Sequence, residues 1–387
     1  MKRGTQAAAV LLWALLLALG LPGRAAAQGV TTSALGGRVT NEQGQPVPGA
    51  QVVATNTRTG AEYRVVTRAD GRFVLQGLQP GGPYRVAVSG LGYAAQSRSD
   101  LTLALGQTGT ADFTLATEAL ALEGISVTAE AGGSVISPTR TGASTVISDS
   151  SITRLPTITR DFTDFTRLVP QVSTSGGGSY GGGRNNRFNN IQIDGAVNND
   201  LFGLAPSGTP GGQAGTKPIT LEAIQEFQVV LAPFDVRQGG FTGVGINAIT
   251  KSGTNELDGT VTFFGRNQDL VGNYRTGGNA ANSPDFGEFK QYETAFSVGG
   301  PIMRDKVFFF AAGELSRRDA PNGVFIGAPG ITINRARADS VISILSSQYG
   351  YDAGSLDEVN LKRESNNFFG RLDFNLGANN RLTLRHN

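Results

Sequence analysis

The pattern of hydrophobic and polar positions changes several times along the chain. An apolar run from Ala7 to Leu19 comes first, and residues 35–115 then break into short β-rich runs separated by Gly, Pro, Asn and Asp. Val86 and Val88 point to one side and their neighbours to the other, as in a half-buried strand. Short strands with closely spaced turns predict a small β-sandwich. The expected strands are Gly37–Thr40, Ala50–Asn56, Glu62–Thr67, Arg72–Leu75 and Tyr84–Ser89.

The middle of the chain mixes helical and strand patterns. The stretch "VISDSSITRLP" indicates a strand followed by a short helix, and the next apolar residues recur at helical spacing until Pro170 ends the helix. Further strands are expected at Phe227–Leu231 and Gly245–Thr250. This pattern predicts a small α+β domain. The residues expected on the buried face of the second helix are Phe162, Phe165, Leu168 and Val169.

After Asp258 the chain alternates apolar and polar residues over long strands. Val261 and Phe263 face one way in the first strand, and Glu293 and Glu314 lie on the inward side of later strands. A soluble sandwich would alternate too, but its interior excludes charges at mid-strand. Tight turns alternate with the long excursion 317–362, which is the outer-membrane pattern of short turns and long loops. About five strands of a transmembrane β-barrel are therefore expected, with aromatic and aliphatic residues toward lipid.

Composition supports a mainly β fold in several domains. The 387 residues are more than one ordinary core fills, and 54 glycines disfavour long helices. The start of the chain has the form of a signal peptide, with cleavage expected between Ala27 and Gln28. Removal of residues 1–27 takes away three cations and changes the formal charge from +2 to (33 − 3) − 31 = −1. Nucleic-acid binding is therefore not expected.

The sequence carries no pattern for covalent chemistry. There is no cysteine, so an exported chain must be stabilised without disulfides and has no site for a lipoprotein anchor. Its single histidine, His386, cannot supply a catalytic zinc site, which needs three protein ligands. The glycine run near residue 180 lacks the Gly-Lys-Ser/Thr of a phosphate-binding loop. We expect no enzyme activity and no metal or other cofactor.

The first domain resembles the carboxypeptidase regulatory-like module. The motifs "GRVTNEQGQPVPGAQVVA", "TRADGRFVLQGL" and "GGPYRVAVSGLGY" carry that resemblance over about eighty residues. Related sandwiches bind glycans, so a carbohydrate-binding role with Tyr84 and Tyr93 as sugar platforms is one possibility. Core or corner positions for the two tyrosines are the other, more common one.

A short β-prone segment, "EGISVTAE", joins this sandwich to the next domain. An extended segment beside glycines can add itself as a strand to the open sheet edge of a partner. From these residues alone, a linker or a last strand of the sandwich is an equal alternative.

The remaining motifs resemble the plug of TonB-dependent outer-membrane receptors, in particular the Oar-like subgroup. They occur in the order "IQIDGAVNN", "AIQEFQVVLAPFDVRQGG" and "GVGINAITKSGTNELDG". The resemblance implies five segments: a signal peptide (1–27), the sandwich (28–117), a linker (118–133), a plug (134–254) and the first barrel strands (255–387). It also implies a TonB box, the strand that pairs with the periplasmic protein TonB. Its candidate residues are Ile125, Ser126, Val127, Thr128 and Ala129.

The resemblance implies an importer in the cell outer membrane that TonB energises, with its N-terminal domain in the periplasm. An unknown extracellular substrate would meet the apical plug loop, residues 176–190. The alternatives are a surface protein of similar build that acts in adhesion or secretion, and a glycan-binding module. We expect a monomer in contact with outer-membrane lipid and, because plugged transporters use ~22 strands, a receptor longer than this chain. The candidate substrate residues are Arg184, Asn185, Asn186 and Arg187.

Overall fold

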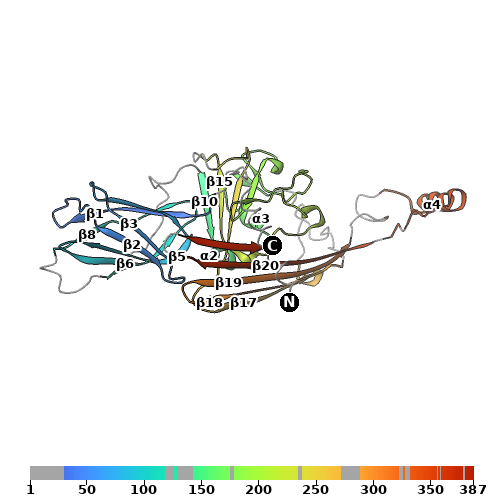
Figure 1. The fold of residues 1–387 in the computed structure, drawn as a ribbon. Helices are drawn as coiled ribbons and strands as arrows, with labels where there is room; N and C mark the ends of the chain where they lie inside the picture. Colours follow the sequence, from blue (N-terminus) through green and yellow to red (C-terminus); the bar gives the residue numbers. More distant parts are fainter. Residues whose placement is uncertain are drawn as a thin grey trace, which may run out of the picture.

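A computed structural model describes residues 30–117, 126–128, 143–174, 178–233, 238–271, 288–321, 326, 332–354, 356–357, 359–377 and 380–387. Three units follow one another along its length: a sandwich (30–117), a central domain (143–252) and a wall sheet (258–387). The sandwich lies at one end of the molecule, and the wall curves beside the central domain (Figure 1). The structure confirms the mainly β fold class. None of the helices in the described part of the chain is long and apolar enough to cross a membrane.

The sandwich buries one apolar core between two sheets. One sheet joins β1 to β4, β7 and β8, and the other has the order β3-β2-β5-β6-β9. Tyr84 is fully buried and its hydroxyl donates to the carbonyl of Gln79 at 2.9 Å, so it is a core residue and not a sugar platform. Tyr93 packs partly buried against the same core. The strands are β1 (Ser33–Asn41), β2 (Gln51–Asn56), β3 (Glu62–Val66), β4 (Arg72–Leu78), β5 (Gly81–Gly90), β6 (Tyr93–Leu103), β7 (Thr108–Thr110), β8 (Phe113–Leu115) and β9 (Ser126–Thr128).

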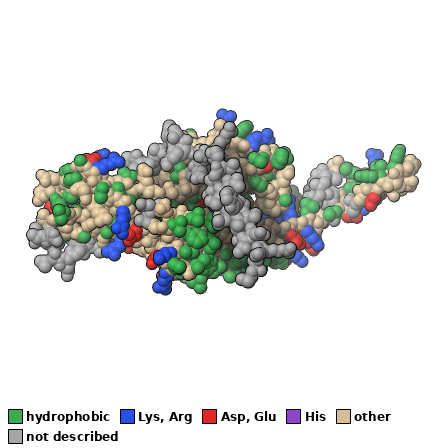
Figure 2. Space-filling model, viewed as in Figure 1, with side chains coloured by type: hydrophobic (Ala, Val, Ile, Leu, Met, Phe, Trp, Pro, Cys, Tyr) green, Lys and Arg blue, Asp and Glu red, His purple; other side chains and the backbone are tan. Residues whose placement is uncertain are grey.

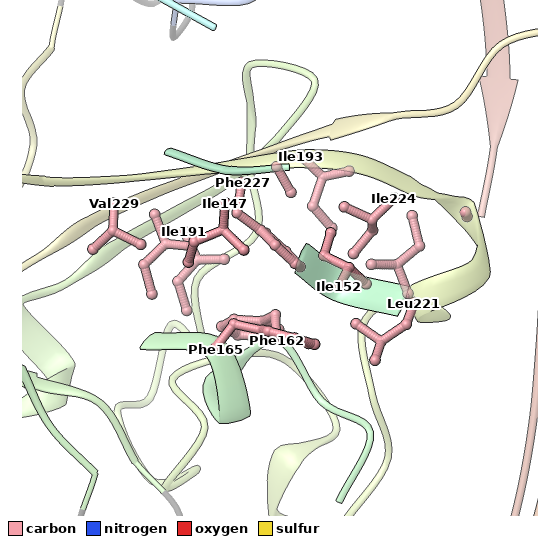
Figure 3. Packing of buried hydrophobic residues seen from close by; sticks show 14 of the residues in the cluster. Ile147, Ile152, Phe162, Phe165, Ile191, Ile193, Leu221, Ile224, Phe227 and Val229 are labelled. Carbon is pink, nitrogen blue, oxygen red and sulfur yellow. The ribbon is translucent and has the colours of Figure 1, made fainter. Parts of the chain in front are cut away.

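The central domain packs short helices against a five-stranded sheet of order β10-β15-β16-β13-β14. The aromatic rings of Phe162 and Phe165 lie against Phe227 at the middle of its core (Figure 3). The strands are β10 (Ala143–Ser148), β11 (Val172–Ser173), β12 (Tyr180–Gly181), β13 (Asn190–Ile193), β14 (Ala196–Val197), β15 (Ile224–Leu231) and β16 (Gly245–Thr250). The helices are α2 (Asp149–Arg154), α3 (Thr163–Thr166) and the 3-10 turns η2 (Asn186–Phe188), η3 (Gly212–Ala214) and η4 (Leu221–Ala223).

The strand-then-helix prediction for β10 and α2 is confirmed, whereas the next helix is shorter than expected. It contains only Thr163–Thr166, and its flanks are turns. Phe162, Phe165 and Val169 are buried as predicted, but Leu168 is exposed because the helical spacing does not continue to it. β15 begins at Ile224, three residues earlier than the pattern indicated.

The wall is a single antiparallel sheet in chain order. Its lipid-side residues Val261 and Phe263 are 81% and 69% exposed, and Phe368 is 59% exposed while its neighbour Phe369 is buried at 3%. Hydrophobic side chains gather over these strands in Figure 2. The alternation read from the sequence therefore places apolar residues outward, as a transmembrane barrel requires. The strands are β17 (Asp258–Asn267), β18 (Lys290–Met303), β19 (Val307–Pro321), β20 (Asn360–Asn375) and β21 (Arg381–His386).

The connections differ sharply between the two ends of the wall. β18 and β19 are joined through the tight turn at residues 304–306, whereas helix α4 (Arg335–Tyr349) lies in the long excursion between β19 and β20, at the end far from the sandwich (Figure 1). The 3-10 turn η5 (Gln268–Leu270) follows β17. The hinge into β17 passes so close to β19 that a Cβ on Gly253 would lie 2.2 Å from the carbonyl oxygen of Phe309. Only glycine fits that approach.

Candidate functional site between the central domain and the wall

Charged side chains from two units of the chain meet in a buried cluster. Arg160 precedes α3, Lys217 lies in the loop before η4, and Glu222 is the middle residue of η4. Glu293 and Glu314 point inward from β18 and β19 of the wall. We call these five residues the ionic cluster. The sequence predicted that the two wall glutamates face inward, but gave no indication of their partners.

The geometry of the ionic cluster is that of charge-assisted hydrogen bonds. Glu293 accepts from Arg160 Nε and from Lys217 Nζ, each at 2.8 Å. Lys217 Nζ also donates to Glu314 at 2.8 Å, and Arg160 donates to Glu222 at 2.9 Å. The side chains of Glu293 and Glu314 are only 1% exposed, so water screens these pairs weakly. The cluster therefore fixes the central domain against the wall by charges from both.

The ionic cluster carries more negative than positive charge. Two cations and three carboxylates give 2 − 3 = −1. Glu314 Oε2 is buried, and no hydrogen-bond partner for it lies within the described residues. Burial raises the pKa of nearby Asp161, while the Thr163 N–H and the Lys217 ammonium oppose that rise. A buried site with excess negative charge depends strongly on each cation that it holds.

A second polar network joins the two units nearer to the sandwich. Arg371 of β20 pairs with Asp373 through two hydrogen bonds, at 2.8 and 2.9 Å, and also donates to the hydroxyl and carbonyl of Thr250. Arg385 of β21 pairs with Asp194 at 3.2 Å. Asp194 in turn accepts from the N–H and hydroxyl of Thr250. The wall therefore binds the ends of β13 and β16 as well as the loops around α3.

The predicted substrate residues lie on one loop, but they are not equivalent. Arg184, Asn185 and Arg187 are exposed, and the Asn185 side chain caps η2 by accepting the Arg187 N–H at 3.1 Å. Asn186, by contrast, is buried, and its side chain donates to the carbonyls of Ala205 and Pro206. Residues 175–177 of the predicted loop lie outside the described residues.

A neighbouring loop presents three apolar side chains that the sequence analysis did not single out. Asp200 accepts the N–H groups of Phe202, Leu204 and Ala205 at 3.1, 2.8 and 2.7 Å. These hydrogen bonds lower the pKa of Asp200, with the bond from Ala205 as the largest cause. A Cβ on Gly203 would lie 3.4 Å from Arg187 Cβ, which puts the two loops side by side. We call the exposed residues of the two loops the apex: Arg184, Asn185, Arg187, Leu201, Phe202 and Leu204.

The TonB-box candidates are only partly covered by the structure. Ser126, Val127 and Thr128 form β9, which pairs with β6 of the sandwich. Ile125 and Ala129 lie outside the described residues, as do Ala27 and Gln28 at the expected cleavage point. The segment thus pairs as a last strand of the sandwich, which was one of the two alternatives for these residues.

Side chains of the central domain hold the sandwich by its main chain. Glu226 accepts the N–H of Leu105 at 2.8 Å, and Gln228 donates to the carbonyl of the same residue at 3.1 Å. Gln225 donates to the carbonyl of Pro80 at 3.0 Å, and Asn247 donates to that of Val30. Burial raises the pKa of Glu226 to about 7, against a smaller lowering by the Leu105 N–H. We call these contacts the docking seam.

A cavity of about 1730 Å³ opens where the three units meet. Its lining includes Tyr63 from the sandwich, Lys251 from the central domain and Arg371 from the wall. Within the described ranges, no group of three or more His, Cys, Asp or Glu residues could hold a metal ion. The geometry shows polar contacts between units around an open space, with the apex loops and the docking seam on separate parts of the central domain.

Comparison with known proteins identifies two domains and a set of relatives. Residues 34–116 match the carboxypeptidase regulatory-like domain, and residues 249–339 match an outer membrane beta barrel domain. The TonB-dependent transporter Oar of Myxococcus xanthus is 27% identical over 315 residues, which cover 76% of this chain. The probable TonB-dependent siderophore receptor PirA of Acinetobacter baumannii is 26% identical over 190 residues, or 45% of this chain.

The chain spans 28% of the length of the Oar transporter and 23% of that PirA. Among solved structures, the Escherichia coli outer membrane transporter YddB is 16% identical over 62% of this chain and 32% of its own, with a TM-score of 0.44. The PirA structure from A. baumannii is 19% identical over 63% of this chain and 31% of its own, with a TM-score of 0.41. The matched domains and the sequence relatives confirm both resemblances drawn from the motifs and the location in the outer membrane.

Proposed function

We propose that this chain, whose two matched domains and sequence relatives are those of TonB-dependent receptors with an N-terminal carboxypeptidase regulatory-like domain, imports a substrate with energy supplied through TonB. In this proposal the central domain is the plug and the wall is part of the surrounding barrel. Substrate binds on the outer side, TonB pulls on the box from the periplasm, and the plug shifts to open a path. No covalent step is needed.

The observation that carries the proposal is the ionic cluster. A plug that must move needs contacts with the wall that can break and re-form. Charged groups that become exposed can form hydrogen bonds with water, whereas exposing apolar contacts, such as those of Phe310 and Phe369 with the central domain, costs about 25 cal/mol for each Å². Buried ion pairs add little net stability over apolar contacts while fixing a single arrangement. The ionic cluster thus favours a plug that has one defined position against the wall and can still separate from it.

The apex is the substrate-facing surface in this proposal. It combines the cations Arg184 and Arg187 with three exposed apolar side chains on a loop whose backbone N–H groups donate to Asp200. Such a surface fits a substrate that has an apolar or aromatic face and an acidic group, since Arg binds carboxylate and phosphate in a bidentate manner. Gly215 of the central domain lies beside Arg363, near the start of β20, so the long excursion of the wall ends beside a loop of the central domain. Replacement of Phe202 by Ala should weaken uptake at low substrate concentration.

The experiment compares the compounds that cells remove from their medium. Wild-type cells, a receptor deletion and a TonB deletion are grown in one defined medium, and mass spectrometry follows each component over time. Import through TonB predicts that at least one component is removed only by the wild type and that both deletions lose it. The proposal is wrong if no component depends on both genes. If cells without the receptor fail to attach to surfaces while cells without TonB still attach, the receptor would instead act in adhesion.

A further inference from the structure

Strand β9 completes one edge of the sandwich. β6 pairs with β5 on one side and, in parallel, with β9 on the other, at Ser97↔Ser126, Arg98↔Val127 and Ser99↔Thr128. Beyond its bridge from Tyr93 to Thr117, β6 without β9 would have unpaired backbone groups around Ser97–Ser99, and such an edge readily accepts another strand. The sandwich therefore has a strand-accepting edge, and the segment that occupies it belongs to the same chain.

Contacts within the sandwich and the docking seam hold β6 in a fixed position. The Arg98 guanidinium lies 5.4 Å from the centre of the Phe113 ring, which is buried in the sandwich core, so β6 is anchored at the middle of its contact with β9. The pairing stops where β6 has an extra residue between Arg98 and Leu101, with Asp100 in the left-handed region at φ 62°. A bulge of this kind ends regular pairing. The docking seam then fixes the whole sandwich on the central domain.

The pairing keeps β9 extended, and no strand in the described part of the chain pairs with its other edge. Within the described residues, β9 is the last strand of its sheet, and its only strand partner is β6. A segment already extended avoids an ordering cost of about 1–2 kcal/mol per residue when a partner strand binds. Three residues in parallel pairing are also a weak attachment, because each hydrogen bond contributes only about 0.5–1.5 kcal/mol net.

We propose that β6 of the regulatory-like sandwich presents the TonB box as a preformed strand and releases it when TonB pulls. The inference rests on the proposed function and adds how the box is regulated. TonB adds to the outer edge of β9, so the sandwich and TonB hold the box together before any force acts. The fifteen residue-to-residue steps from Thr128 to Ala143 can span at most about 50 Å when extended, so a released box can travel while it stays attached to the central domain.

A disulfide can test the pairing because the chain contains no cysteine. Ser97→Cys with Ser126→Cys joins two residues that are partners in the register, whereas Ser97→Cys with Thr128→Cys is two residues out of register. Two residues along a strand add an offset of about 6.6 Å to the spacing of about 4.8 Å between strands, so the Cα atoms of the second pair are about 8 Å apart, beyond the reach of a disulfide. The first pair should cross-link in resting cells of the full-length receptor, and the second should not.

Two measurements on the cross-linked receptor show whether the sandwich presents the box to TonB or hides it from TonB. The purified periplasmic domain of TonB should bind the oxidised Ser97–Ser126 variant at least as tightly as the reduced one. Energised uptake should be lost in the oxidised variant and return on reduction, because the box cannot leave β6. The inference is overturned if the first pair gives no higher yield of disulfide than the mismatched pair. It is also overturned if TonB binds the oxidised form ten times more weakly than the reduced form. If the reduced variant and the wild type both fail to bind TonB, the proposed function itself is wrong.

Discussion

Replacing Lys217 by methionine removes the cation that joins two wall glutamates to the central domain. Lys217 Nζ lies 2.8 Å from both Glu293 and Glu314, and its side chain is 11% exposed. The charge of the ionic cluster changes from 2 − 3 = −1 to 1 − 3 = −2. Removal of one partner from a buried pair costs about 3–5 kcal/mol, because the remaining charge stays buried without compensation. The attachment of the central domain should weaken by a factor of about 10²–10⁴, since 1.36 kcal/mol corresponds to a factor of ten.

Hydrogen–deuterium exchange of the full-length receptor measures this weakening directly. Amides of β15 and β16 should exchange faster in the Lys217→Met variant by a similar factor, while wall strands on the lipid side serve as an internal reference. Lys217→Met combined with Glu314→Gln restores the cluster charge to 1 − 2 = −1 and should recover at least half of the lost protection. Equal exchange in the single and double variants would refute the electrostatic account.

Three further changes test other contacts. Val127→Pro removes a backbone donor from β9 and should abolish TonB-dependent uptake while the receptor still inserts into the outer membrane; uptake that survives would place the box elsewhere. Glu226→Gln should stabilise the docking seam at pH 8 and have little effect near pH 4.5: because burial raises the Glu226 pKa to about 7, deprotonation destabilises the folded state progressively as pH rises from about 4.5 through 7. Exchange of the Leu105 amide across that range would show a wild-type pH dependence that the variant lacks. Val261→Arg on the lipid face should destabilise the folded barrel by about 2–4 kcal/mol in a membrane-refolding titration, whereas Val261→Leu should be close to neutral.

The sequence predicted the two faces of the wall because alternation is a local signal. Phe368 and Phe369 are identical neighbours, yet one faces lipid and the other lies in the core shared with the central domain, as the period of two requires. The same rule put Glu293 and Glu314 on the inward side. A period of two depends only on the next few residues, so it can be read without knowledge of the rest of the fold.

The ionic cluster and the docking seam could not be predicted in this way. Arg160 is 133 residues from Glu293, and Leu105 is 121 residues from Glu226, so no local pattern relates them. Asn186 shows the same limit on a smaller scale, because its burial depends on carbonyl groups about twenty residues away. The TonB-box candidates and the apical substrate residues remain predictions, whereas the fold class and the location in the outer membrane are confirmed.

Strand β10 determines how a mechanical load would enter the central domain. It is the edge strand of the sheet and the first described element after β9, so tension on the box reaches the domain at Ala143. A load on one end of an edge strand separates its six pairs with β15 in sequence, beginning at Ala143↔Leu231. Each step breaks contacts of about 1 kcal/mol rather than the whole ladder at once. The four strands behind β10 can keep their pairing while a modest, steady force opens the domain from its margin.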